Sequence, residues 1–475
     1  MIWKTAWKNV WRNRVRSLVV IASVTVGIFA GVFAIAFMNG MIAQRFDAAI
    51  DEEISHIQIT GNDYILNNDP QIVITPADSV VPAVSRIPGV KGLVERTIIT
   101  GMAGTASKSA GVMIAGVNPV REKEIFQLYQ TIIPGTGDFF ERESKYDLAL
   151  IGQDLAKELN IIRFAIDSTV LKKLVELKVP VEVTGKLATI SGKRFPNEKR
   201  FTSTVTSLLS KAELRQYGAL IKKESWSFRE NSRMTLTFLD NNNNQVSSVF
   251  RIAGIYDIKN AMYEQSMVFL KNEVLCRLAG IENDSFHQVI IRLDEVGQTD
   301  NITNEIRRLF HDLDVRNWKE IQPDLAMMTD YVQQIYALFM AIILAALAFG
   351  IINTMLMAVL ERTKELGMLT AIGMNKRKVF SMIMLESVFL SIIGGVTGMI
   401  VGWITVVLSA KQGINFSQYA EGMEALGYSA HIFPEISANY FLLITLMIVI
   451  TGVLSSVYPA RKALKLDPAE AIRTE

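Results

Sequence analysis

Uncharged, strongly hydrophobic stretches recur four times along this sequence and dominate its pattern of apolar and polar positions. They cover residues 18–38, 331–360, 387–408 and 439–457. None of them contains Asp, Glu, Lys or Arg. Because a helix rises about 1.5 Å per residue, each stretch is long enough to cross a hydrocarbon core roughly 30 Å thick. The sequence therefore predicts four membrane-spanning helices, at 17–40, 331–360 (with a protruding stalk), 379–410 and 438–458.

Between the first two predicted spans, residues 41–330 have the composition of a water-soluble α+β domain. Period-two alternation at 56–60 (HIQIT) and 71–75 (QIVIT) predicts two strands. An Asn-rich turn at 240–244 separates two more alternating segments, which predicts a β-hairpin. Further segments predict helices at 77–87, 273–279 and 301–313, strands at 90–101, 111–117, 267–270, 287–293 and 315–321, and a strand followed by a helix within 146–160. The predicted fold class is an α-helical membrane protein with four spans and a large α+β extracytoplasmic domain between the first and second.

The first 16 residues predict an interfacial amphipathic helix. Trp3, Trp7, Val10 and Trp11 fall on one helical face, and the segment also carries five Lys and Arg and no acidic residue. Indole rings favour headgroup depth, and cations favour anionic lipid. An ordinary positively charged segment before the first span is the simpler interpretation, and it gives the same orientation. Both place the N-terminus in the cytoplasm.

The connection between the second and third spans, residues 361–378, is a second strongly charged segment next to the predicted membrane helices. It carries five Lys and Arg, and its apolar residues recur at three- and four-residue spacing up to Gly373. This pattern predicts a short cytoplasmic amphipathic helix; a solvated loop that only fixes topology is the alternative. The basic tail at 459–475 belongs on the same side, whereas the outward segment 411–437 has a single Lys. Both termini are therefore expected inside.

Small residues mark helix faces that other helices can approach closely. Gly27 and Gly31 form one GxxxG pair in the first span, and the third span carries a double one, formed by Gly394, Gly398 and Gly402. Without a Cβ, glycine lets two helix backbones come together. The third span has the stronger packing signal.

A search for catalytic and metal-binding motifs finds none. The sequence has no P-loop, HExxH, CxxC, GxSxG or dinucleotide-binding pattern, and its four histidines are scattered without ligand spacing. The single cysteine, Cys276, lies among apolar residues and is expected to be a core residue. A net charge of +2 gives no reason to expect nucleic acid. No ionisable residue interrupts the middle of a span, so any transport has to be driven from outside this chain. We predict no catalytic residues, no metal site and no cofactor.

Several stretches together give a resemblance to a known family. They are the basic, Trp-bearing start, the sequence ERTKELGMLTAIGMNKRKVFSMIMLES from Glu361, the Gly-rich third span and the closing YPARKALKLDPAEAIRTE. They resemble the FtsX/MacB superfamily of ABC-transporter permeases. HIQIT with GNDY at 61–64, AGVNP at 115–119 and LALIGQDLAKELNI at 148–161 are similar to the lipoprotein-releasing (LolC/LolE-type) permeases.

The resemblance implies a mechanism of mechanotransmission in a bacterial inner membrane, with a MacB-like domain in the periplasm. The permease would form a homo- or heterodimer and bind a cytoplasmic ABC ATPase dimer, which holds ATP and Mg²⁺. The connection after the second span would be the coupling helix that docks on the ATPase. By position its residues are Glu361, Arg362, Glu365, Gly367, Leu369 and Gly373.

For a lipoprotein releaser, the resemblance also implies that acyl chains enter from the outer leaflet between the first and second spans. A periplasmic carrier would then receive the lipoprotein. Candidates for lining the acyl-chain path are Phe33, Phe37, Met340 and Phe349. An ordinary role for these residues in lipid contact or helix packing is the alternative.

The sequence departs from the family pattern at 162–230, which interrupts the expected strand succession. This segment predicts a subdomain with a helix at 168–177, a strand pattern at 179–190 and a basic turn at 193–200. It either decorates the surface or binds a partner. Two other functions share the same topology. One is MacB-like export of peptides or drugs, and the other is FtsX-like regulation of a periplasmic enzyme.

Overall fold

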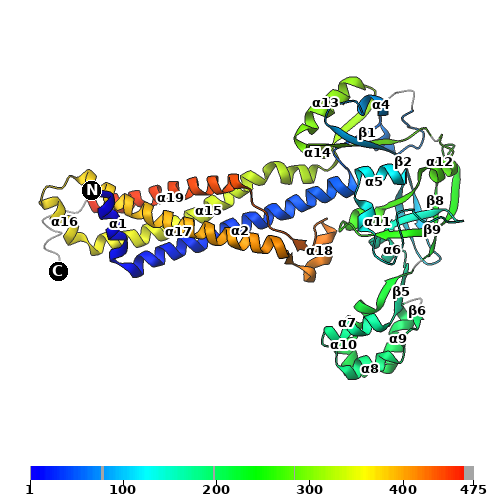
Figure 1. Cartoon of the computed structure of the whole chain (residues 1–475), viewed down its shortest axis with the longest axis horizontal. Helices are drawn as coiled ribbons and strands as arrows, with labels where there is room; N and C mark the ends of the chain where they lie inside the picture. Colours follow the sequence, from blue (N-terminus) through cyan, green and yellow to red (C-terminus); the bar gives the residue numbers. More distant parts are fainter. Residues whose placement is uncertain (1, 76–79, 196–197, 230, 283, 465–475) are drawn as a thin grey trace. The chain divides into compact units, whose positions relative to one another are not determined.

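The computed structural model describes residues 2–75, 80–195, 198–229, 231–282 and 284–464. The chain divides into two compact units, which are considered separately (Figure 1). The helical unit comprises Met1–Arg45, Asp324–Ala420 and Ser429–Glu475. The sheet unit comprises Phe46–Pro323 and Glu421–Tyr428.

Four helices are long and apolar enough to span a membrane, as the hydrophobic pattern predicts. They are α2 (Arg14–Ala48), α15 (Pro323–Glu361), α17 (Lys376–Gln412) and α19 (Ala438–Leu464). A π-helical turn, η1 (Ala49–Glu53), continues α2 without a break. With 39 residues, α15 is about 58 Å long, nearly twice the thickness of a hydrocarbon core. The helices thus extend beyond the uncharged stretches that predict them.

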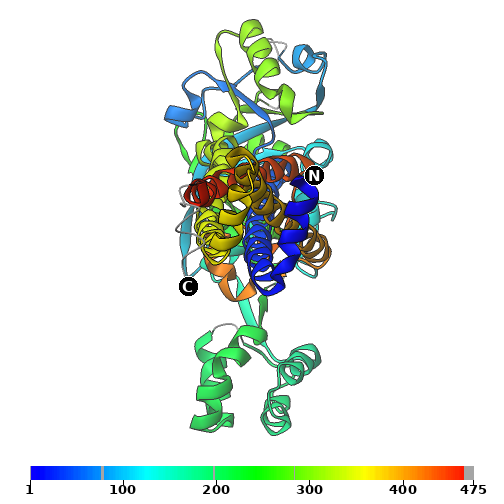
Figure 2. The same ribbon diagram turned by 90° about the vertical axis from the view of Figure 1, so that its left-hand side faces the viewer.

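Shorter elements accompany the long helices (Figure 2). Helix α1 (Ile2–Arg12) precedes α2, and α16 (Thr363–Ala371) connects α15 with α17. The segment between α17 and α19 contains a small antiparallel pair, β13 (Ile414–Asn415) and β14 (His431–Ile432), with η5 (Ser417–Tyr419) and α18 (Ala420–Ala425) between them. Of the basic tail predicted at 459–475, Arg461 and Lys462 lie in the last turn of α19, and residues 465–475 lie outside the described part.

The glycines singled out in the sequence lie where α2 approaches its neighbours. A Cβ on Gly27 would lie 2.8 Å from Leu347 Cδ1 of α15, and one on Gly31 would lie 2.8 Å from Met340 Cε. On α17, a Cβ on Gly398 would lie 2.7 Å from the carbonyl oxygen of Thr25. Gly394 and Gly402 face Val24 and Val32 of α2 in the same way. Helix α2 is therefore packed between α15 and α17.

The sheet unit is built on nine strands in the order β12-β1-β11-β2-β3-β10-β4-β9-β8. Their bounds are β1 Ile57–Gly61, β2 Val90–Gly104, β3 Ser109–Val117, β4 Leu148–Gly152, β8 Arg233–Leu239, β9 Gln245–Tyr256, β10 Met267–Lys271, β11 Gln288–Leu293 and β12 Leu313–Asn317. Strand β2 pairs along its first half with β11 and along its second half with β3 and β8. The β2–β8 pairing closes six strands into a ring, whose inward side chains form an apolar core.

Gly101 makes this ring closure possible. It lies opposite Phe238 in the β2–β8 register, and a Cβ there would lie 2.7 Å from the carbonyl oxygen of Thr237. The predicted hairpin forms as β8 and β9, with Leu239 paired to Gln245 across the Asn-rich turn. Asn243 has a φ of +60°, a conformation that Asn tolerates better than most residues.

Helices cover the two halves of the sheet. Near β1, β11 and β12, α4 (Val80–Val84) and α13 (Thr299–Leu309) close a second apolar core. The predicted helix at 77–87 thus appears as α4, and residues 76–79 lie outside the described part. The other short helices are α3 (Tyr64–Asn67), α5 (Pro119–Ile125), η3 (Leu128–Thr131), α6 (Gln153–Glu158), α11 (Ala261–Ser266), α12 (Asn272–Ala279), η4 (Val296–Gln298) and α14 (Trp318–Ile321).

The segment at 162–230 has a sheet and a core of its own. Its elements are β5 (Ile162–Ala165), α7 (Ser168–Glu176), α8 (Val181–Ala188), β6 (Arg194–Phe195), α9 (Glu198–Leu208), α10 (Lys211–Ser225) and β7 (Trp226–Phe228). The three strands pair in the order β6-β5-β7, and a separate apolar cluster fills the space between them and the helices.

Two strand predictions are wrong, and a third, at 315–321, holds only in its first part, because β12 ends at Asn317 and Trp318–Ile321 form α14. Within residues 179–190, Val181–Ala188 form helix α8, because Val183 and Leu187, one turn apart, bury one face and Pro180 directly precedes the first turn. β-Branched residues favour strands only weakly, so packing decides. Residues 71–75 form no strand; Ile74 makes a single isolated bridge with Phe286 and fills the core under α4.

Candidate functional site at the charged end of the helical unit

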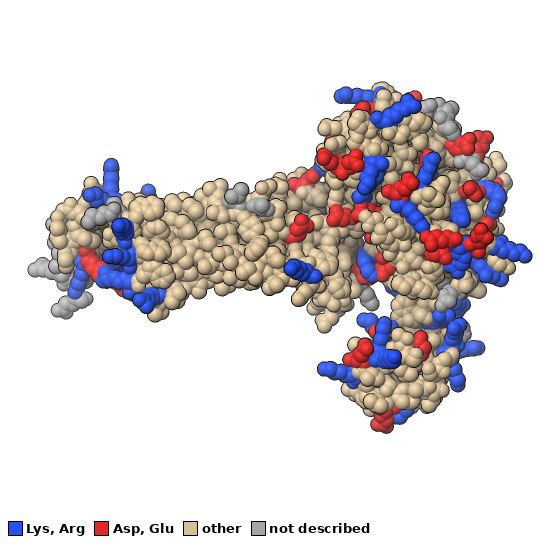
Figure 3. Space-filling model, viewed as in Figure 1, with Lys and Arg blue, Asp and Glu red and all other residues tan. Residues whose placement is uncertain are grey.

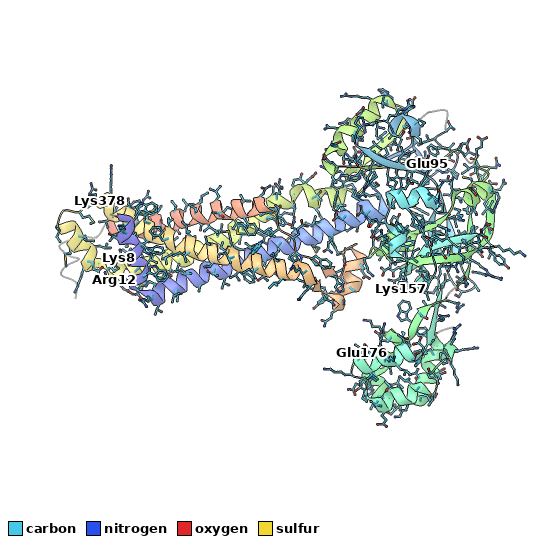
Figure 4. All side chains as sticks on the ribbon, in the orientation of Figure 1. Lys8, Arg12, Glu95, Lys157, Glu176 and Lys378 are labelled. Carbon is cyan, nitrogen blue, oxygen red and sulfur yellow. The ribbon has the colours of Figure 1, made fainter. Side chains whose placement is uncertain are left out.

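Charged side chains gather at one end of the helical unit, where α1, α16 and the first turns of α2 and α17 lie (Figures 3 and 4). Helix α1 ends at Arg12, and α2 begins at Arg14. On the other chain segment, Gly373 turns the chain after α16 with a φ of +94°. Asn375 then caps α17, its side chain accepting a hydrogen bond from Arg377 N at 2.9 Å. Two sharp turns thus bring four helix ends together.

Ion pairs connect these helix ends. Arg12 of α1 makes a two-pronged contact with the carboxylate of Glu365 in α16, and its Nη1 lies 2.9 Å from Glu365 Oε2. Arg16, in the first turn of α2, pairs with Glu361 at the end of α15. A bidentate guanidinium–carboxylate contact fixes orientation as well as distance. The start of the chain is therefore joined to the connection between the second and third long helices.

Arg362 extends this network to α17. Its Nε lies 3.0 Å from Glu365 Oε2, and its Nη1 lies 3.4 Å from Glu386 Oε2. The side chain of Glu386 is 11% exposed, whereas that of Arg12 is 59% exposed. An exposed ion pair contributes little to stability by itself. Breaking a pair in a poorly solvated site, however, leaves a buried charge without its partner. Arg362 and Glu386 are therefore the anchor of the network, and Arg12 is its outer member.

The contact between Arg12 and Glu365 also shifts the pKa of both groups. The hydrogen bond from Arg12 holds the pKa of Glu365 below its usual range, Arg362 adds to the effect, and partial burial opposes it. The same bond to Glu365 raises the pKa of the Arg12 guanidinium. Both groups thus stay charged across the physiological range.

A polar cavity of about 270 Å³ lies between these side chains. Its walls come from α1, α2, α15, α16 and α17, and its charged lining consists of Arg12, Arg16, Glu361, Arg362, Glu365 and Glu386. The three cations and three carboxylates of this lining balance one another. The cavity is a joint between helices, with no excess charge to select an ionic ligand.

The residues that the sequence assigns to coupling divide into inward and outward groups. Glu361, Arg362 and Glu365 make the ion pairs described above, and Gly367 is buried. Leu369 packs against the core of the helical unit. Gly373 is exposed at the turn. Most of the predicted set therefore holds α16 in place, and does not project from it.

The outward face of α16 consists of residues that the sequence prediction omits. Lys364, Met368 and Ile372 follow one another at four-residue spacing, and all three are exposed, Met368 at 56% and Ile372 at 79%. Four-residue spacing places Lys364 and Met368 on one stripe of α16, and Ile372, the residue directly after the helix, continues it, because its N–H still donates to Met368 O at 3.0 Å. The sequence carries a signal for this stripe, because an apolar pair stands beside a lysine on the face opposite Leu366 and Leu369.

Helix α1 differs from its predicted amphipathic face. Trp3, Trp7 and Trp11 lie on the exposed side, whereas Val10 and Ala6 are buried against the helical unit. Trp3 and Trp7 also contact Phe389 of α17 edge-to-face, with ring centroids 5.6 Å apart in each case. Val10 therefore belongs to the buried face, and the three indoles lie on the exposed side of α1.

The four candidate path residues lie in different surroundings. Met340 is buried and lines a small apolar cavity of about 60 Å³ between α2 and α15, together with Gly31 and Tyr336. Phe33 stacks on Phe29 instead. Phe37 contacts Phe416, and Phe349 is 74% exposed on α15. Of the four, Met340 is the one that lines this cavity between the first and second long helices.

Two histidines of the sheet unit have structural roles. His56 Nδ1 accepts a hydrogen bond from Leu293 N at 3.2 Å, and His287 Nδ1 accepts one from Ile98 N at 3.1 Å. Cys276 is buried in the core of the strand ring. Within the described ranges, no group of three or more His, Cys, Asp or Glu side chains is arranged to hold a metal ion.

Two protein-family models match parts of the chain. Residues 337–468 match the FtsX-like permease C-terminal domain, and residues 17–227 match the MacB-like periplasmic core domain. An uncharacterized ABC transporter permease of Methanocaldococcus jannaschii is 25% identical, over 48% of this chain and 55% of its own length. The Macrolide export ATP-binding/permease protein MacB of Bdellovibrio bacteriovorus is 33% identical, over 34% of this chain and 22% of its own length.

A third relative, the uncharacterized ABC transporter permease YknZ of Bacillus subtilis, is 31% identical over 34% of this chain and 36% of its own length. The chain thus spans no more than about half the length of these curated relatives. A particular closeness to lipoprotein-releasing permeases does not emerge from these matches. The chain carries an FtsX-like permease domain and a MacB-like periplasmic core domain, and it is homologous to the MacB and YknZ ABC permeases.

Proposed function

We propose that this chain is the permease subunit of an ABC transporter, which couples ATP hydrolysis on a partner chain to rearrangement of its own sheet unit. The observation that carries the proposal is the ion-paired joint formed by Arg12, Arg362, Glu365 and Glu386. It fixes α16 to α1 and α17 and leaves Met368 and Ile372 exposed. A helix held on one face and apolar on the other is suited to receive a force from a docked protein.

The direction of the proposed coupling follows from charge. Lys and Arg are gathered in three segments beside the long helices: the N-terminus, residues 362–378 and the end of α19. All three segments flank the long helices on the same side. We place this end in the cytoplasm of a bacterial cell by the positive-inside rule, and the sheet unit in the periplasm. The ATPase would then meet Lys364, Met368 and Ile372. The complex would contain two permease chains and two ATPase subunits.

The network supplies a route for the movement. Displacement of α16 pulls on Glu365, and through Arg362 on Glu386 of α17. Arg12 draws α1 along, and Arg16 keeps the end of α15 beside the start of α2. Because charged pairs join all of these helix ends, they move together. The long helices then carry the motion out of the membrane, since α15 is about twice as long as the hydrocarbon core is thick.

For the substrate we retain two candidates. Extraction of lipoproteins from the outer leaflet is supported by the apolar cavity between α2 and α15, which Met340 and Gly31 line. At about 60 Å³ the cavity is closed to an acyl chain, so entry requires the two helices to separate. Export of small molecules or peptides is favoured by relatives whose names refer to macrolide and pyoverdine export.

Reconstitution in nanodiscs tests the proposal. The full chain is purified from its native membrane in mild detergent with its co-purifying proteins, and ATP hydrolysis is measured with and without the permease. We expect an ABC ATPase to co-purify and its activity to depend on this chain. A chain that neither binds nor alters any ABC ATPase would overturn the proposal. Release of a triacylated lipoprotein from proteoliposomes, compared with ATP-dependent efflux of a macrolide, then separates the two substrates.

A further inference from the structure

A buried carboxylate joins the two segments at which long helices enter and leave the sheet unit. Glu53 is the last residue of the π-helical turn that continues α2, and Gln322 directly precedes Pro323, the first residue of α15. We propose that Glu53 and Gln322 form the joint that passes movement of these two helices into the strand ring. The proposal rests on the proposed permease function and adds the residues that transmit it.

Both oxygens of the Glu53 carboxylate accept hydrogen bonds. Its Oε1 accepts a hydrogen bond from Asn260 Nδ2 at 2.9 Å, and its Oε2 accepts one from Gln322 Nε2 at 3.1 Å. The residue is 2% exposed. Leaving a buried carboxylate without donors is costly, so these two bonds are needed wherever Glu53 stays buried.

The third partner belongs to the short helix after β9. The hydroxyl of Tyr263 donates to the carbonyl oxygen of Glu53 at 3.4 Å. Asn260, besides its bond to Glu53, caps α11 by accepting from Tyr263 N at 3.3 Å. Helix α11 connects β9 with β10, both of which are strands of the closed ring. One residue thus joins the end of the first long helix, the start of the second and the ring.

Neighbouring contacts hold the same two segments. Arg292 of β11 pairs with Asp51 at 2.5 Å and donates to the carbonyl oxygen of Ile50 at 3.0 Å. Phe46 contacts Trp318 edge-to-face, with ring centroids 4.9 Å apart. All these residues lie within the sheet unit. Residues 46–53 and 318–322 are therefore fastened to the sheet and to each other.

The local backbone fits a transmitting role. A π-helical turn is wider than an α-helical one and is frequent at functional sites. Here it brings Ala49 and Ile50 into the core while turning Glu53 toward Asn260 and Gln322. An axial shift of either helix must carry α11 with it or break a bond to Glu53. Movement at the membrane is thereby converted into movement of the ring.

The test uses the full chain with its ATPase in nanodiscs. Hydrogen exchange in peptides covering α11, Ala261–Ser266, is compared with and without ATP and vanadate. We expect nucleotide to change exchange in the parent protein, and Glu53→Leu to reduce this change at least about fivefold, the lower end of typical coupling between sites. Basal ATP hydrolysis should remain, because Glu53 belongs to the sheet unit and takes no part in the ion-paired network around α16.

Conservative variants separate the joint from general stability. In Glu53→Gln, the amide oxygen still accepts from Asn260, and Gln322 can turn its amide oxygen toward the new NH₂ group, so most of the response should survive. Tyr64→Phe is the matched control, because it removes one buried hydrogen bond, from Tyr64 to the carbonyl oxygen of Ile98 at 2.8 Å, elsewhere in the sheet unit.

Every result of this experiment either supports or contradicts the proposed joint between Glu53 and Gln322. A folded Glu53→Leu protein with the full nucleotide response would overturn the joint. Where that variant does not fold, Gln322→Leu, which removes the amide that donates to Glu53 Oε2, gives the same comparison. A parent protein that binds the ATPase but shows no nucleotide response in α11 also overturns it. A parent protein that binds no ATPase refutes the proposed function itself, and the joint with it.

Discussion

The guanidinium of Arg12 and the carboxylate of Glu365 meet although 353 positions separate them in the sequence. Arg12 ends the N-terminal helix α1, and Glu365 lies in the first turn of α16. The family resemblance assigns Glu365 to an ATPase contact. In the structure it faces the helical unit, where Arg362 shares it and passes the contact on to Glu386. The N-terminal helix is therefore joined by ion pairs to the connection between the second and third long helices.

Reversal of the charge at Glu365 should uncouple the permease from its ATPase. In Glu365→Lys, the new ammonium group would face both Arg12 and Arg362, so α16 would lose its support. We expect membrane insertion to persist and permease-dependent stimulation of ATP hydrolysis to fall about five- to tenfold, within the usual range for coupled sites.

The charge swap is the control for this prediction. Arg12→Glu combined with Glu365→Lys restores opposite charges across the contact, and the carboxylate introduced by Arg12→Glu would also lie near Arg362. Stimulation by the double variant should exceed that of either single variant. A Glu365→Lys protein with normal stimulation would contradict the assignment of Glu365 to the joint.

The exposed stripe of α16 should carry the binding energy for the ATPase. Replacement of Ile372 by Glu places a charge where an apolar side chain, 79% exposed in the isolated chain, would be buried in the complex. A central apolar contact contributes about 2 kcal/mol or more, so ATPase affinity should fall roughly 30-fold. Co-purification and titration with the purified ATPase measure this. Met368→Leu keeps the apolar surface and should bind normally; equal binding by Ile372→Glu would exclude this face.

Much of the architecture follows from periodicity alone. The four long helices are evident because an uncharged stretch of about 19 or more residues has few other stable environments. The β8–β9 hairpin follows from its alternation and its Asn-rich turn. Residues 179–190 differ from the prediction because Val, Thr and Ile favour strands only slightly, and the burial of Val183 and Leu187 in the core of this segment outweighs that preference. Residues 71–75 alternate as a strand would but pair only at Ile74, where they make a single bridge.

The sequence predicts the position of the site but not its orientation. A helix with charges on one face and Met and Ile on another gives no indication of which face meets the rest of the chain. The orientation of α16 depends on Arg12 and Glu386, which approach this helix only in the folded structure. Nothing in the sequence singles out Glu53 and Gln322, because each is an ordinary polar residue until the chain brings residues 46–53 and 318–322 together.

The glycines of α17 should be essential where they meet α2. A Cβ on Gly398 would lie 2.7 Å from a backbone oxygen of Thr25 and 2.9 Å from Ile28 Cβ, so Gly398→Leu forces the helices apart. Overpacking of this kind costs about 1–3 kcal/mol. We expect a lower melting temperature in detergent. Gly350→Leu of α15 is the matched control, because its Cβ would meet nothing within 4 Å. Equal destabilisation by both variants would contradict the packing of α2 against α17.

Lowering the pH should reduce the folding stability of the sheet unit because of His56. Burial lowers the pKa of His56 to about 4, and Arg292 and Lys91 add to the effect. The unfolded chain, with a pKa near 6.5, takes up the proton first, so stability is full above about pH 6.5 and is lost as the pH falls toward 4. The loss is at most about 1.4 kcal/mol per pH unit for one proton.

A variant without a titrating ring isolates this contribution. His56→Asn supplies an amide oxygen that can accept from Leu293 N but does not titrate. Calorimetry of the full chain in detergent should therefore show a flatter pH dependence for His56→Asn than for the parent protein, with similar stability at about pH 7.5, where the ring is neutral in both states. Parallel curves for His56→Asn and the parent would show that His56 is not responsible, because only a group whose pKa differs between the folded and unfolded chain can tilt the curve.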